Sequence, residues 1–175
     1  DLAQRTEVTL KTARAGERPR VLLDGEDVTE LIRRPEVNAV VSHVARIAGV
    51  RERLVALQQA MAQRGAVVMD GRDIGTVVLP SADVKVFLTA SLSERARRRQ
   101  AELRQAGHRL SLEQVEAELA RRDELDSQRE QSPLCQAPDA VLVDTTGKTV
   151  EQVVDEIVRL CREAAARKRG WVTHR

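Results

Sequence analysis

The stretch Asp70-Gly71-Arg72-Asp73 places two acids and an arginine around a glycine, directly after a short apolar run. The planar guanidinium of Arg72 matches a phosphate group, Asp73 can accept hydrogen bonds from an amine, and Asp70 can hold Mg²⁺ through water molecules. Gly71 lets the backbone turn sharply or approach a ligand closely. These residue types fit an ordinary turn with solvated charges equally well, so the stretch alone leaves both interpretations open.

A second group of charges lies in RRDELDSQRE, residues 121–130. Arg122 precedes Asp126 by four positions and Arg129 follows it by three, so on a helix the three side chains share one face. They could form a binding site for an anion. They could also form an exposed ladder of ion pairs, which would contribute roughly a few tenths of a kcal/mol to stability.

A third group consists of four arginines in SLSERARRRQ, namely Arg95, Arg97, Arg98 and Arg99. The stretch lacks the matching acids of a helix that neutralises its own charge, although a solvated face would also explain it. Only 1% of the residues are aromatic. Arginines without aromatic neighbours favour small phosphates over single-stranded nucleic acid, which needs stacking platforms.

These charges must be positioned by regular elements. Short apolar runs at 66–70, 84–88 and 140–143 are separated by helical patterns, which predicts parallel strands buried on both faces. Ligands of such sheets bind beyond the carboxyl ends of the strands. Residues 70–73 occupy such an end.

The remaining pattern predicts a small antiparallel sheet and several helices. Residues 7–11 and 20–23 read as two strands, Asp24-Gly25 as a tight turn, and the region near Val28 as a third strand. Apolar spacing predicts helices over 37–47, 50–64, 91–105 and 111–125, and a last one from 149 that frays after 166. Ser111 with Gln114, and Thr149 with Gln152, are typical of capping boxes.

The composition narrows the class of protein. A chain of 175 residues suits one domain with a mobile part. It is 42% hydrophobic and 32% charged with a net charge of +2, so neither nucleic acid nor membrane is demanded. Cys135 and Cys161 are too few for a disulfide framework. No apolar run reaches about 18 residues and no signal peptide is visible, so we expect a cytoplasmic protein.

The sequence resembles the bacterial cytidylate kinases, which are nucleoside monophosphate kinases. The matching stretches run in order from about Val21 to Val158: LLDGEDVTELIRRPEVNAVVSHVARIAGVRERLVALQQ, DGRDIGTVVLPSADVKVFLTASLSERARRR and RRDELDSQREQSPLCQAPDAVLVDTT. The resemblance implies an α/β fold with a P-loop kinase-like, doubly wound parallel sheet, a small antiparallel monophosphate-binding insert and a helical lid.

The resemblance also implies a division of the chain. Residues 1–64 would form the insert and its returning helix, and 65–90 the core strands with the Asp-Gly-Arg-Asp loop. Residues 91–130 would form the lid and its hinges, and 131–175 the last core strand and helix.

The contacts with the base and the phosphate implied by the resemblance use five residues. Ser42 and Arg51 would contact the cytosine ring, and Asp73 would accept a hydrogen bond from its exocyclic amine. Arg72 and Arg129 would hold the phosphate of CMP. Uracil reverses the donor and acceptor at this edge, so UMP would leave buried groups unpaired at about 1–3 kcal/mol each.

Lid and sugar contacts are implied by the same comparison. Arg122 and Asp126 would lie near the sugar, at the hinge of the lid, and Arg95, Arg98 and Arg99 would belong to the lid itself. Three arginines would support catalysis by neutralising charge during phosphoryl transfer: Arg72, Arg122 and Arg129.

The ligands implied are CMP or dCMP as acceptor, ATP as phosphate donor and Mg²⁺ as cofactor, with Asp70 as a water-mediated Mg²⁺ ligand. The resemblance also implies a monomer that needs neither nucleic acid nor a membrane.

The family's Walker A loop, G-x-x-x-x-G-K-[ST], is missing from these residues. The chain starts within the insert. We therefore expect the C-terminal part of a longer kinase, unstable and inactive alone, whose absent first strand would lie between 66–70 and 84–88. Two alternatives remain open: a non-catalytic descendant that binds nucleotide or a partner, and a basic helical module that binds RNA through the arginines of residues 95–129.

Overall fold

The computed structural model describes residues 2–11, 19–63, 65, 67–128, 130 and 132–172, and only the backbone of residues 42 and 170–172. The chain divides into two compact units, Asp1–Val67 and Val68–Arg175. Within the described ranges, no helix has the length and apolarity needed to span a bilayer.

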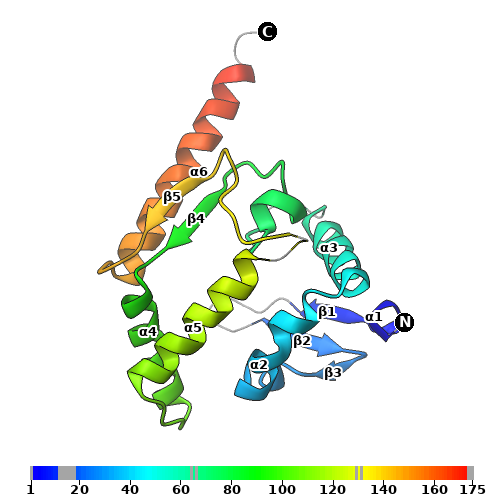
Figure 1. Ribbon diagram of the computed structural model, residues 1–175. Coiled ribbons are helices and arrows are strands. Elements are labelled where there is room, and N and C mark those ends of the chain that lie inside the picture. Colours follow the sequence, from blue (N-terminus) through cyan, green and yellow to red (C-terminus); the bar gives the residue numbers. More distant parts are fainter. Residues whose placement is uncertain are drawn as a thin grey trace. The chain divides into compact units, whose positions relative to one another are not determined.

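The first unit contains the predicted antiparallel sheet, in the order β1 (Val8–Lys11), β2 (Arg20–Leu23) and β3 (Glu26–Asp27) (Figure 1). Asp24 and Gly25 join β2 to β3 with φ angles of 50° and 87°. Two positive φ values are the conformation that a two-residue hairpin turn requires, and Asp-Gly is a preferred sequence for it. The backbone N–H of Glu7 donates to Oδ1 of Asp24 at 2.7 Å, which ties the start of β1 to this turn.

The helices of the first unit follow the predicted apolar spacing. The helix predicted over 37–47 is α2 (Pro35–Val44), which begins at Pro35 because proline fits the first turn of a helix. The helix predicted over 50–64 is α3 (Ala48–Ala62). Two short elements were not predicted from the sequence: α1 (Leu2–Arg5), which lies against α3, and the 3₁₀ turn η1 (Leu31–Arg33).

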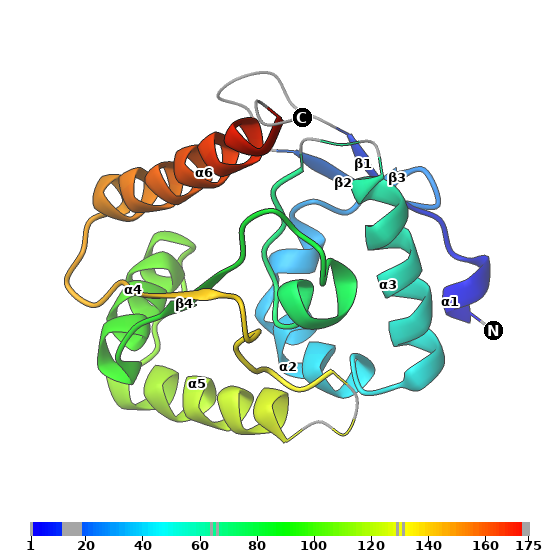
Figure 2. The same cartoon turned by 90° about the horizontal axis from the view of Figure 1, so that it is seen from above.

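The second unit is built on a parallel strand pair and a helical hairpin. Strand β4 (Val86–Thr89) pairs with β5 (Val141–Asp144), so that Thr89 and Asp144 lie side by side at the carboxyl ends. Helices α4 (Leu92–Gln105) and α5 (Leu112–Ser127) pack on each other in both views (Figures 1 and 2). Their shared core consists of Ala96, Leu103 and Val115, with Leu110, Leu112 and Leu119 around it.

The strand predicted at 66–70 is wrong for the residues that the structure describes. Residues 67–70 form no strand, and Val68 is 98% exposed; residue 66 lies outside the described residues. A parallel strand is stabilised only by hydrogen bonds to a neighbour, and among the described strands β4 pairs with β5 alone. The α/β class with a parallel pair is therefore confirmed, whereas the larger doubly wound sheet is not formed by these residues.

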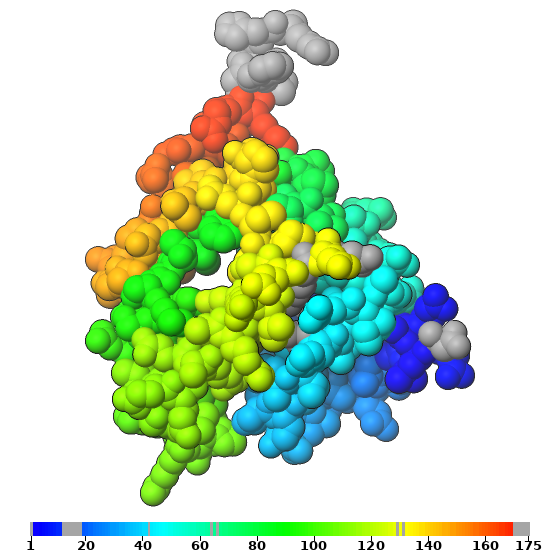
Figure 3. All heavy atoms as spheres, viewed as in Figure 1, coloured from blue at the N-terminus to red at the C-terminus, as the bar shows by residue number. Residues whose placement is uncertain are grey.

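The last helix, α6 (Val150–Val172), is longer than expected. Its start is confirmed: the N–H of Thr149 donates to the Gln152 side chain at 2.9 Å, and the N–H of Gln152 donates to Oγ1 of Thr149 at 3.3 Å. The helix continues past 166 instead of fraying there. Of residues 161–169, Ala164 alone is buried, and this half of α6 projects from the rest of its unit (Figure 3).

Candidate functional site

The Asp70–Asp73 loop leads into a short π-helix, η2 (Ile74–Val78). The backbone carbonyl of Asp73 accepts the N–H groups of residues 76, 77 and 78, at 3.3, 2.9 and 3.2 Å. Asp73 itself is buried. A Cβ on Gly71 would lie 2.9 Å from Cγ1 of Ile74, so any other residue at position 71 would force the Ile74 side chain to move. The loop is thus fixed at its glycine and at the backbone carbonyl of its last residue, Asp73.

Arg72 and Asp126, predicted as separate clusters, meet in the second unit. Nε of Arg72 donates to Oδ2 of Asp126 at 3.0 Å, and Nε of Arg122 lies 3.9 Å from the same oxygen. The Asp126 side chain is 1% exposed and that of Arg72 is 43% exposed. A buried carboxylate needs charged hydrogen-bond donors to offset its lost hydration. Asp126 therefore gathers two of the predicted arginines around one buried charge.

The geometry at Arg72 leaves one side of its guanidinium available. Nε is used by Asp126, and within the described part of the chain the two terminal amino groups donate to no other residue. A guanidinium held through Nε is oriented and can still bind a phosphate with its terminal amino groups. The arrangement can therefore present a fixed anion-binding fork to solvent.

Three other predicted residues are placed only in part. Ser42 belongs to α2 and Arg51 to the first turn of α3, both in the first unit. Arg51 is half-buried, and the Ser42 side chain lies outside the described residues, as does the whole of Arg129.

Three of the four predicted arginines of α4, Arg95, Arg98 and Arg99, have acidic partners, so the expectation that they lack matching acids is wrong for these three. Arg95 pairs with Asp123 of α5 at 2.7 Å and Arg99 with Glu102 at 3.0 Å. Nε of Arg95 also donates to the carbonyl of Ala90 at 3.2 Å. Asp123 could not be matched to Arg95 from the sequence, because it comes from the neighbouring helix.

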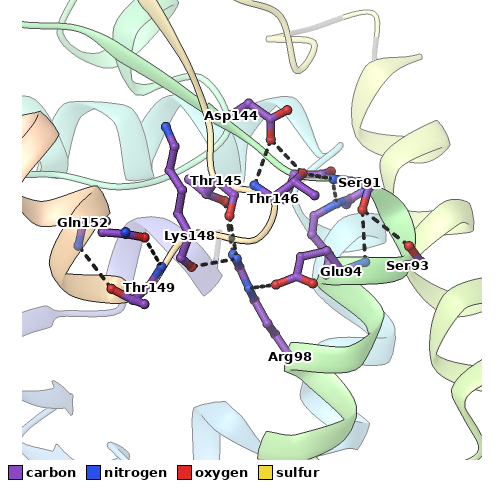
Figure 4. A network of polar contacts seen from close by, with 12 residues as sticks. Ser91, Ser93, Glu94, Arg98, Asp144, Thr145, Thr146, Lys148, Thr149 and Gln152 are labelled. Carbon is purple, nitrogen blue, oxygen red and sulfur yellow. Dashed lines mark hydrogen bonds and ion pairs between the residues drawn. The ribbon is translucent and has the colours of Figure 1, made fainter.

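Arg98 makes contacts of a different kind (Figure 4). Its Nε donates to Glu94 at 2.9 Å, and its terminal amino groups donate to Oγ1 and the carbonyl of Thr145 at 3.1 and 2.7 Å, and to the carbonyl of Lys148 at 3.5 Å. Thr145 and Lys148 belong to the loop between β5 and α6. Arg98 thus fastens the first turns of α4 to that loop.

The loop between β5 and α6 was not singled out from the sequence. Thr145 is buried, and its N–H and Oγ1 both donate to the carbonyl of Thr89, at 2.8 and 3.0 Å. The N–H and hydroxyl of Thr146 donate to Asp144, which holds the pKa of that carboxyl below its usual value. The signal that could have found this loop is Asp-Thr-Thr directly after an apolar strand, at the ligand-binding edge of a parallel sheet.

Asp70 is the predicted Mg²⁺ ligand and is exposed. Within the described residues, no group of three His, Cys, Asp or Glu side chains could hold a metal ion. Mg²⁺ usually keeps several water molecules and is bound by one or two carboxylates together with substrate phosphates. A single exposed carboxylate beside an arginine fork fits that mode of binding.

Comparison with known proteins shows the family of this chain. The sequence matches the cytidylate kinase family over residues 1–163. It is 57% identical to the cytidylate kinase of Symbiobacterium thermophilum, covering 93% of this chain and 71% of that protein. It is 56% identical to that of Desulforamulus reducens (90% and 70%) and 55% identical to that of Desulfitobacterium hafniense (91% and 67%). The chain therefore belongs to the cytidylate kinase family of nucleotide-binding transferases.

Proposed function

We propose that this chain binds CMP or dCMP as the acceptor of a phosphoryl group whose donor is ATP. The observation that carries the proposal is the hydrogen bond between Nε of Arg72 and the buried Asp126. It orients an arginine fork beside Asp73, and the residue chemistry of this loop supports binding of a nucleotide there.

The phosphate of CMP would be held by the terminal amino groups of Arg72. Arg122 lies at the same carboxylate and adds a second positive charge near that position, and Arg129 would supply a third. Phosphoryl transfer depends on positioning and on neutralising the charge of the transferred group. Arginines held by a buried carboxylate supply both without having to reorganise during the reaction.

In the second unit, the cytosine base would be recognised by Asp73. Cytosine presents an amine donor next to two acceptors, which an aspartate and an arginine complement. UMP presents an acceptor where CMP has the amine, so it would leave the Asp73 carboxylate facing another acceptor. An unpaired buried polar group costs about 1–3 kcal/mol, which corresponds to roughly tenfold or more in affinity.

ATP would bind as its Mg²⁺ complex, with Asp70 holding the ion through water. The ion would neutralise charge on the phosphates. The hairpin of α4 and α5 would act as the lid, with Arg95, Arg98 and Arg99 on α4. Closure of a lid excludes water, which prevents hydrolysis of ATP in place of transfer.

The cradle for the ATP phosphates is not among these 175 residues, because they contain no Walker A sequence. We propose that the chain supplies the acceptor site and the lid, and that it binds CMP without forming CDP by itself. An RNA-binding role is less favoured, because Arg95, Arg98 and Arg99 are each engaged by carboxylates or carbonyls.

Calorimetric titration of the folded chain tests the acceptor site. We expect CMP to bind more tightly than both cytidine and UMP. Arg72→Ala should reduce the affinity for CMP toward that for cytidine, because the phosphate loses one of its three arginines. Asp73→Asn should reduce the preference for CMP over UMP.

Arg97→Ala is the matched control, because Arg97 is an exposed arginine of α4. Its loss removes one positive charge, as Arg72→Ala does, but outside the Asp70–Asp73 loop. It should leave CMP binding unchanged. Equal affinity of the unaltered, folded chain for CMP and cytidine would refute the acceptor site. Rapid formation of CDP from ATP and CMP would refute the separation of acceptor and donor sites.

A further inference from the structure

Lys85 is a buried lysine next to the loop of the proposed site, and nothing in the proposed function uses it. It lies immediately before β4, and its side chain is 7% exposed. Its ammonium donates to both carboxylate oxygens of Asp139, at 2.9 and 2.8 Å, and to the carbonyl of Pro80. An ammonium has three N–H donors, so every one of them has an acceptor.

These bonds join three segments of the second unit. Pro80 belongs to the turn that follows η2, and Asp139 to the loop that precedes β5. The backbone carbonyl of Lys85 also accepts the N–H of Val141 at 2.9 Å, which continues the pairing of β4 with β5. Lys85 therefore fixes the exit of η2 against the start of the parallel strand pair.

The aliphatic stem of Lys85 covers η2 directly. A Cβ placed on Gly75 would lie 3.4 Å from Cδ and 3.7 Å from Cγ of Lys85, and 3.8 Å from Cβ of Ala137. Gly75 is the second residue of η2, and Asp73 directly precedes η2 as its N-cap, with a carbonyl that accepts three N–H groups of η2. Because Gly75 is two residues after Asp73, a change in the packing at Gly75 would also move the backbone of Asp73.

We propose that Lys85 is a positioning residue for base selection. Asp139 and Pro80 hold its ammonium in place, so that its aliphatic stem packs on η2. This packing keeps Asp73 in the position in which it binds the base. This inference rests on the proposed function. The side chain of Asp139 is 64% exposed, so water can solvate its carboxylate without the ion pair. The role that we assign to the ion pair is to hold the aliphatic stem of Lys85 against η2.

The experiment compares the dissociation constants of CMP and UMP, by calorimetric titration, with the melting temperature of each variant. Lys85→Met keeps the length of the stem and removes the clamp. We expect it to weaken CMP binding roughly fivefold and to lower the preference for CMP over UMP roughly threefold, because a displaced Asp73 loses its hydrogen bond to the amine. Lys85→Arg retains a cation for Asp139 and should restore part of the preference.

Asp139→Asn is the second variant, because it alters an exposed side chain and leaves the fold intact. It should shift the preference in the same direction by a smaller factor. Lys168→Met is the matched control: it removes the exposed ion pair of Lys168 with Asp83, in the turn between Pro80 and β4, and should leave the preference unchanged.

A loss of melting temperature without any change in the preference, in both Lys85→Met and Asp139→Asn, would show a purely structural role and overturn the inference. Failure of the unaltered chain to prefer CMP over UMP would instead overturn the proposed function, and this inference with it. The two failures are therefore distinguishable in the first titration.

Discussion

The buried carboxylate of Asp126 accepts a hydrogen bond of 3.0 Å from Nε of Arg72, a residue 54 positions earlier in the chain. The bond joins the end of α5 to the loop that follows residue 69. The loss in stability depends on which partner is removed, because the aspartate is buried whereas the arginine is half-exposed. Removing the arginine would leave a buried charge short of a donor, and removing the aspartate would leave an arginine that water can solvate.

Asp126→Asn should therefore reduce both stability and phosphate affinity. A hydrogen bond to a charged group contributes about 1.5–3 kcal/mol, and an amide in this position keeps one acceptor oxygen, so we expect a loss of about 1–3 kcal/mol in the free energy of unfolding. CMP should bind more weakly because Arg72 is no longer oriented. Urea denaturation and CMP titration measure the two effects.

Glu118→Gln is the control for Asp126→Asn, because it neutralises an exposed acid on the same helix. It should change the free energy of unfolding by less than about 0.5 kcal/mol. An Asp126→Asn protein as stable as Glu118→Gln would contradict the role assigned to the buried carboxylate.

Arg98→Gln should loosen the start of α4 from the loop between β5 and α6. The substitution removes the two bonds to Thr145 and the bond to Glu94. We expect faster hydrogen exchange at the N–H of Thr145, which donates to Thr89, because opening of this loop exposes that amide. Exchange measured by NMR reports the change residue by residue.

The matched control for Arg98→Gln is Arg97→Gln, one position earlier on α4 and exposed. Both variants lose one positive charge, and only the first loses the contacts to the loop. Equal exchange at Thr145 in the two variants would mean that charge, and not the fastening of the loop, governs its opening.

The features that could be predicted from the sequence are those whose causes are local. Capping boxes at Ser111 and Thr149 and the turn at Asp24-Gly25 depend on residues within three positions of each other, and all three occur as expected. Parallel strands at 84–88 and 140–143 were predicted from mainly apolar runs, and β4 and β5 lie within two residues of those bounds; that these two strands pair with each other was not predicted.

The features that could not be predicted depend on segments meeting in space. Spacing on α5 placed Arg122 and Asp126 on one face, but it could not show that this carboxylate is buried and bound to Arg72. Counting acids within one helix also missed the pairing of Arg95 with Asp123. The strand expected at 66–70 failed for the same reason, since a parallel strand needs a neighbour that its own sequence does not specify.

Ser111→Ala should destabilise α5, the helix that carries Arg122 and Asp126. The Ser111 hydroxyl accepts the N–H of Gln114 at 3.2 Å, and the Gln114 side chain accepts the N–H of Ser111 at 2.9 Å. Loss of an N-cap side chain costs about 1 kcal/mol. Ser127→Ala, at the exposed last residue of α5, is the control, and a comparable loss of stability in both variants would contradict the capping role.

Asp27 supplies a pH-dependent contribution to the stability of the first unit. Its pKa is lowered from 3.8, first by the hydrogen bond from the Thr29 hydroxyl, then by the Thr29 N–H, and less by the charges of Arg20 and Lys11. A lowered carboxyl pKa stabilises the folded state above the unfolded pKa and loses that contribution as pH falls through the folded pKa. Stability should therefore decline as the pH drops below about 4.

Thr29→Val should raise the pKa of Asp27 toward 3.8 and flatten this decline, whereas Thr29→Ser, which keeps the hydroxyl, should preserve it. NMR titration of the Asp27 carboxyl measures this pKa: an unchanged pKa in Thr29→Val would assign the shift to the backbone N–H of residue 29 and the neighbouring cations instead of the hydroxyl.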